Sequence, residues 1–161
     1  MGHHAELCRR LIELGAKTDC VTNRLETPLL LCTKRESWSP RKIEYASFHD
    51  PASTPETVRV LIEKGRNDPM DVDQTGWNSL FIAAVNDRTD SISTLLTQDE
   101  FEIDLNYVTT GGLMVGGCIS TREYISTALI TPLLRRGIDI NAPCKKVWYF
   151  RFGPKSHRIE G

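Results

Sequence analysis

The sequence predicts an all-α fold, a solenoid of paired short helices, because one pattern of residues returns along the chain. Its best copy begins with the apolar run 78–84 and ends in Asp104-Leu105-Asn106. A related copy begins at 111–117, 33 residues further on, and ends in 137–141. A period near 33 residues with two short helices per unit is typical of repeat proteins, whose units stack side by side and present an extended surface.

An earlier copy begins at Thr27-Pro28-Leu29 and ends in Asp71-Val72-Asp73. These first residues predict a helix start, because a Thr hydroxyl can cap free backbone N–H groups and Pro fits the first helical position. Across the copies, this first helix is expected at short apolar runs that contain small residues, namely 29–32, 80–84 and 113–117.

The second helix of the unit is predicted by an alignment of two segments. Residues 6–15 match residues 56–65 without a gap, with apolar residues at 8, 11 and 12 in one segment and at 58, 61 and 62 in the other. This spacing predicts one buried stripe on each helix. The closing glycines, Gly15 and Gly65, are expected to take the left-handed conformation that ends a helix. The corresponding segments of the later units are 90–96 and 133–137.

These segments together resemble the ankyrin repeat, whose pattern is roughly G-x-TPLHxAA, a turn, then E-hydrophobic-V-x-LLL-x-x-GADVN. Thr27-Pro28-Leu29 matches TPL, the segment 76–84 matches G-x-TPLHxAA loosely, and 137–141 matches GADVN closely. The resemblance covers about residues 4–142. It implies antiparallel helix pairs joined by β-hairpin-like loops, and a non-catalytic scaffold or protein–protein interaction module that needs no cofactor.

The resemblance divides the chain into a repeat array at 1–143 and an aromatic, basic tail at 144–161. The tail is expected to cover the open apolar side of the last unit, although it could instead bind a partner or nucleic acid. Four units are expected: 3–20, which lacks its first helix, 23–73, which carries a loop insertion at 36–54, then 74–106 and 107–141.

Departures from the pattern lie in the first and last units. The second helix at 6–15 has no first helix before it and is expected to expose an apolar stripe that such a helix normally covers. This favours a fragment of a larger ankyrin-repeat protein whose effector domain lies outside this chain, or a misplaced start. In the alternative, His3, His4 and Glu6 provide a polar cap. Gly116-Gly117 is expected to weaken a helix, and Pro132 either kinks the last helix or begins a new one after Thr131.

The bulk composition excludes several classes of function. The chain has 161 residues and a net charge of -1, so it has no overall attraction to nucleic acid or to an anionic membrane. It contains no apolar run of about 18 residues and no signal peptide at Met1–Glu6. Its five cysteines are widely spread without a CxxC motif. These features favour a monomer in a reducing compartment, cytoplasmic or nuclear.

Sites for chemistry are weakly supported. His4 and Cys8 share a helical face and could bind zinc with other His and Cys residues, but the cysteines fit small apolar positions of the repeat better. Cys118 and His157 could be imagined as a nucleophile and base, without any motif around them. The sequence therefore predicts no enzyme and no metal. Ser39, followed by Pro40, is a candidate phosphorylation site, and the alternative is an ordinary solvated loop.

The predicted partner is a protein of unknown identity, bound at the hairpin tips and the inner face of the first helices. Trp77 and Tyr107 are the expected anchors, because aromatic residues dominate interface hot spots. Packing of Trp77 on the neighbouring hairpin is an equally supported alternative. The positions expected to be exposed and variable are Asn23, Arg24, Glu26, Lys34, Arg35, Gln74, Thr75, Trp77, Asn86, Tyr107, Val108 and Thr110.

Overall fold

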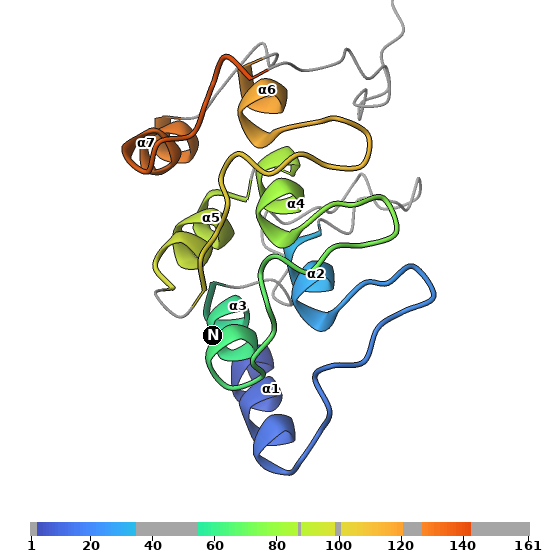
Figure 1. Ribbon diagram of the computed structural model, residues 1–161. Coiled ribbons are helices and arrows are strands. Elements are labelled where there is room, and N and C mark those ends of the chain that lie inside the picture. The colour runs from blue at the N-terminus through green and yellow to red at the C-terminus, as the bar shows by residue number, and fades with distance from the viewer. Residues whose placement is uncertain (1–2, 35–54, 87, 99–100, 121–126, 143–161) are drawn as a thin grey trace, which may run out of the picture.

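The computed structural model describes residues 3–34, 55–86, 88–98, 101–120 and 127–142 (Figure 1). In these ranges the regular structure is helical throughout, with one isolated antiparallel bridge between Val72 and Asn78, which confirms the all-α prediction. The predicted insertion, Arg35, Ser39, His157 and the tail lie outside the described residues. The helices are α1 (His3–Glu13), α2 (Pro28–Thr33), α3 (Pro55–Glu63), α4 (Ser79–Val85), α5 (Thr89–Leu96), α6 (Val115–Ser120) and α7 (Thr127–Arg135).

The helices form two layers. Helices α1, α3, α5 and α7 pack in this order in one layer, and α2, α4 and α6 pack in order in the other (Figure 1). Between the layers, α3 packs on α2 and α5 packs on α4. The core lies between the layers and contains Leu29, Ile62, Leu80, Phe81, Ile92 and Leu95, all fully buried.

Local capping explains where the first helices begin. The Thr27 hydroxyl accepts a hydrogen bond from the Leu30 N–H at 3.2 Å, and Pro28 follows as the first helical residue of α2, as predicted. The Asn78 side chain takes the same role for α4 and accepts from the Phe81 N–H at 2.8 Å. Each cap satisfies a backbone donor that the first helical turn leaves without a partner.

The predicted stripe is buried on α3 but not on α1. Val58, Leu61 and Ile62 are buried, because α3 lies between α1 and α5 and also contacts α2. On α1, Leu11 is 46% exposed, as expected for the second helix of a unit that lacks its first helix. The same sequence spacing gives different burial, because α1 has its main contact with α3 alone among the described helices.

In the described part of the chain, three turns share one pattern of backbone hydrogen bonds. They are 22–26, 73–77 and 109–113. In each, the first N–H donates to the fifth carbonyl at 2.9–3.1 Å, and the fourth N–H donates to the first carbonyl at 2.8–2.9 Å. The fourth residue has a positive φ: 59° at Leu25, 74° at Gly76 and 72° at Gly112. These turns lie where hairpin-like loops were predicted.

The turns correct the predicted register of the last unit. Asp73 and Thr109 begin equivalent turns and lie 36 residues apart, not 33. Helix α6 therefore begins at Val115, and Leu113, expected within it, occupies the turn position of Trp77. Likewise, the equivalent of Asp104 is Asp68 rather than Asp71: the Asp68 and Asp104 carboxylates accept from the N–H two residues ahead at 2.8 and 2.9 Å.

The predictions for glycine and proline positions are confirmed in part. Gly15 has a φ of 88° as predicted, but after α3 the left-handed residue is Arg66, with a φ of 52°, so that expectation is wrong for Gly65. Helix α7 continues through Pro132, so no new helix begins there. At Gly116 a Cβ would lie 1.8 Å from the Asp139 carbonyl oxygen. This glycine lets α6 approach the segment that follows α7, a role that the sequence did not reveal.

Replacing Gly76 by Ala should destabilise the chain by about 1–3 kcal/mol. Its φ is 74°, and a Cβ would lie 2.6 Å from the Thr110 hydroxyl oxygen and 2.9 Å from the Thr110 backbone nitrogen. The matched control is Gly137→Ala, where φ is 85° but no atom lies within 4 Å. Urea denaturation should show the larger loss for Gly76→Ala. Equal losses would show that the contact with Thr110 does not constrain the turns.

Candidate binding surface

The three turns lie side by side along one side of the helix layers (Figure 1). The Gln74 N–H donates to the Arg24 carbonyl at 2.9 Å, which joins the first turn to the second. The Thr110 hydroxyl donates to the Thr75 carbonyl at 2.5 Å, which joins the third turn to the second. We call these turns, 22–26, 73–77 and 109–113, the turn row. Direct bonds between neighbours hold their spacing.

A charged cluster fixes the base of the turn row. The Lys34 ammonium group contacts the Glu26 carboxylate and lies 3.4 Å from an Asp73 carboxylate oxygen. The other Asp73 oxygen accepts from the backbone N–H groups of Thr75 at 2.9 Å and Trp77 at 3.1 Å. Lys34 therefore links a residue of the first turn to the organising residue of the second turn.

The environment lowers the pKa of both carboxyl groups. For Glu26, the hydrogen bond from Lys34 favours the charged form and outweighs burial, and a hydrogen bond from Thr22 at 2.9 Å adds to it. For Asp73, burial by itself would raise the pKa, but hydrogen bonds from Thr75 and Trp77, with the charge of Lys34, bring it below its ordinary value. Both groups are therefore held as carboxylates that stabilise the cluster.

Burial corrects part of the predicted surface. Glu26 is only 8% exposed, so its predicted exposure is wrong: both its carboxylate oxygens are used inside the cluster. Lys34, Trp77, Asn86 and Tyr107 are half-buried. The Trp77 ring packs on the Phe81 ring at a centroid distance of 5.0 Å, and the Asn86 amide donates to the Ile82 carbonyl at 2.8 Å. The Trp77 ring therefore packs on α4 of its own unit, whereas the predicted alternative was packing on the neighbouring hairpin.

The remaining predicted positions that the structure describes are exposed. The hydroxyl groups of Thr75 and Thr110 are both engaged within the turn row. Helix α4 contributes little, since each residue from Ser79 to Ala84 is buried, so the predicted inner helix face is covered there. Of the predicted positions, Asn23, Arg24, Gln74 and Val108 are exposed and carry side chains that are open to a partner.

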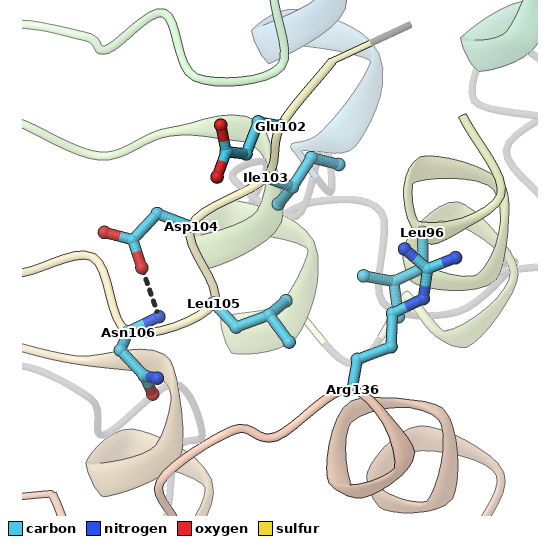
Figure 2. A pocket seen from close by; sticks show the side chains of 7 residues that line it. All are labelled: Leu96, Glu102, Ile103, Asp104, Leu105, Asn106 and Arg136. Carbon is cyan, nitrogen blue, oxygen red and sulfur yellow. Dashed lines mark hydrogen bonds between the residues drawn. The ribbon is translucent and has the colours of Figure 1, made fainter. Parts of the chain in front are cut away.

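One cavity lies away from the turn row and was not predicted. Its volume is about 720 Å³, and it lies between the segment 102–106 and Arg136, beyond the end of α5. Figure 2 shows Ile103 and Leu105 on the side of Arg136 and Leu96, while the Glu102 and Asp104 carboxylates extend the other way. The Asp104 carboxylate accepts the Asn106 N–H at 2.9 Å, so it shapes the local turn.

No group of three or more His, Cys, Asp or Glu side chains in the described ranges could hold a metal ion. His4 is exposed and Cys8 is half-buried on α1. Cys118 is buried in α6. None of the helices described is long and apolar enough to cross a membrane.

Acid should destabilise the protein through the charged cluster. The pKa values of Glu26 and Asp73 lie below their ordinary values of 4.5 and 3.8 in the folded state, so their contribution is complete above about pH 4.5 and is lost as the pH falls through the folded-state values. The free energy of unfolding, measured by urea denaturation from pH 7 to pH 2.5, should therefore fall with acid.

The double variant Glu26→Gln/Asp73→Asn should be less stable at pH 7, and its free energy of unfolding should fall much less with acid. The control, Glu63→Gln, removes an exposed carboxylate outside the cluster and should keep the wild-type profile. A double variant with the wild-type acid slope would assign the pH dependence to other groups.

Neither the models of known protein families nor the sequences of curated proteins match this chain.

Proposed function

We propose that this chain is an ankyrin-type repeat module that binds a protein partner through the turn row, without catalysis and without a cofactor. The observation that carries the proposal is the repetition of one turn at 22–26, 73–77 and 109–113, with the same backbone bonds and direct links between neighbours. A row of turns held at fixed spacing is pre-organised, so a partner bound across it pays little for ordering the surface.

The two layers of helices support the same proposal. Stacked units that contact mainly their neighbours form an extended surface, which suits recognition of another macromolecule. The resemblance of residues 27–29 and 137–141 to the ankyrin pattern adds to this. The partner is a protein, and the module acts as a monomer in the cytoplasm or nucleus. The net charge of -1 supports a protein over nucleic acid as the partner, and the widely spread cysteines support a reducing compartment.

The burial pattern narrows the binding surface to the turns. Because residues 79–84 of α4 are buried, the first helices offer less than the turns do. Arg24 is the most suitable anchor among the exposed positions, since Arg is enriched in interface hot spots and Arg24 makes no ion pair or side-chain hydrogen bond within the described residues. Gln74 and Val108 extend the surface to the second and third turns.

The triple variant Arg24→Ala/Gln74→Ala/Val108→Ala should lower partner affinity by about tenfold or more, or roughly 1.4 kcal/mol, with an unchanged thermal melt. The partner is captured from cell lysate on the immobilised chain and identified by quantitative mass spectrometry. Its affinity is then measured by calorimetry with the purified partner. The control variant, Glu63→Ala/Lys64→Ala/Asp90→Ala, changes exposed residues of the other helix layer and should bind as wild type. A triple variant that retains full affinity would contradict the role of the turn row.

A further inference from the structure

A second cavity lies between two successive loops of the stack. It has a volume of about 350 Å³ and is lined by residues of the segments 18–27 and 65–72. The Thr18 hydroxyl donates to the Gly65 carbonyl at 2.6 Å and joins the two segments at one point. The cavity, here called the loop groove, is therefore a fixed opening between loops that are tied together.

Leu25 has an unusual place in the loop groove. Its φ is 59°, in the left-handed region, where the equivalent turn positions hold Gly76 and Gly112. A leucine in this region is strained, and strain of this kind clusters at functional positions. The side chain gains little packing in return, since it is 54% exposed. A glycine would adopt this conformation without strain, so the turn itself does not account for a leucine at this position.

Two further aliphatic side chains line the loop groove with Leu25. Val21 is 53% exposed and Val72 is 38% exposed. Single exposed apolar residues are common, but these three line one cavity. They form an apolar wall from both segments that can take one aliphatic side chain of a ligand.

Two carboxylates of the loop groove have no hydrogen-bond donor among the described residues. Asp19 and Asp71 both line it, and neither carboxylate makes an ion pair or a hydrogen bond in the described part of the chain. Among the lining residues described, Arg66 is the one cation against these two carboxylates. Partial burial and, to a smaller extent, the negative charge of Asp68 raise the pKa of Asp71. Asp68 therefore adds a third carboxylate near this edge of the loop groove.

Asn67, which lines the loop groove, carries a further acceptor. Asn67 is 5% exposed, and its amide nitrogen donates to the Gly65 carbonyl at 3.1 Å. This bond directs the amide oxygen elsewhere, and that oxygen is buried with no hydrogen-bond donor. A buried acceptor without a donor is costly and adds to the negative potential. A ligand that carries a cation and N–H donors would offset this excess of negative charge and of hydrogen-bond acceptors.

We propose that the loop groove binds a basic segment of the protein partner, with an aliphatic side chain against Val21, Leu25 and Val72 and a lysine or arginine next to Asp19 and Asp71. This inference rests on the proposed function and identifies the chemistry of one part of the partner. The cation would form charge-assisted hydrogen bonds with the carboxylates, which are stronger than neutral ones. Neutral and acidic peptides are the alternatives that the test distinguishes.

The test uses two blocked peptides, acetyl-Leu-Lys-Leu-amide and acetyl-Leu-Glu-Leu-amide, titrated into the full chain labelled at its Leu and Val methyl groups. The lysine peptide should shift the methyl resonances of Val21, Leu25 and Val72 with an affinity at least tenfold higher than the glutamate peptide. Equal affinity of the two peptides, or no shift up to about 10 mM, where binding would be weaker than about 3 kcal/mol, would overturn the proposal.

Two variants test whether the peptide binds at the carboxylates of the loop groove. Asp19→Asn/Asp71→Asn should lower the affinity for the lysine peptide about tenfold and remove the preference over the glutamate peptide. The matched control, Glu102→Gln/Asp104→Asn at the larger cavity, should change neither. If the Asp19→Asn/Asp71→Asn variant still prefers the lysine peptide, or if the control loses this preference, the peptide binds outside the loop groove and the proposal fails.

The triple variant Arg24→Ala/Gln74→Ala/Val108→Ala separates the two proposals. It should still respond to the lysine peptide while it loses the partner. If it loses the partner and the wild type does not bind the peptide, the loop groove proposal fails and the turn row proposal stands. If it keeps the partner while the peptide binds as expected, the turn row proposal fails by itself.

Discussion

The carboxylate of Asp73 is the interaction on which the arrangement of the turns depends. One oxygen accepts from the N–H groups of Thr75 and Trp77, which sets the course of the middle turn. The other lies 3.4 Å from the Lys34 ammonium group, which also contacts Glu26. Asp73 is only 6% exposed, so these contacts operate with little competition from water. One side chain thus shapes its own turn and ties it to the preceding unit.

The middle turn then fixes its neighbours by backbone contact. Gln74 bonds to the Arg24 carbonyl on one side, and Thr75 receives the Thr110 hydroxyl on the other. Gly76 is needed between them, because a side chain would meet Thr110. Close approach without a Cβ is also what allows α6 to lie against the segment around Asp139. Stacking in this chain therefore depends on a few small residues as much as on apolar burial.

The proposed binding features follow from this framework. A turn row with fixed spacing leaves Asn23, Arg24 and Gln74 exposed at its edge, while Glu26 and Asp73, which hold its base, are buried. The loop groove arises where two successive loops are joined through Thr18 and Gly65 but do not close on each other. Leu25 belongs to both, since it completes a turn of the row and lines the groove.

The sequence by itself determined the local elements. Thr27-Pro28 begins a helix because its capping group and fixed φ act within one turn of backbone, and the apolar spacing at 58, 61 and 62 gives a helical face whatever the neighbours are. These signals were enough to predict an all-α chain of short helices and the turns between them. Exposed positions such as Arg24 and Gln74 also followed from the register.

The tertiary structure decided what depends on neighbours. Glu26 is polar but buried, because Lys34 and Thr22 satisfy it. The register of the last unit moved by three residues because the turn at 109–113, bonded to its neighbour through Thr110, fixes where α6 begins. Contacts between residues distant in sequence settle these outcomes, and a local pattern carries no information about them.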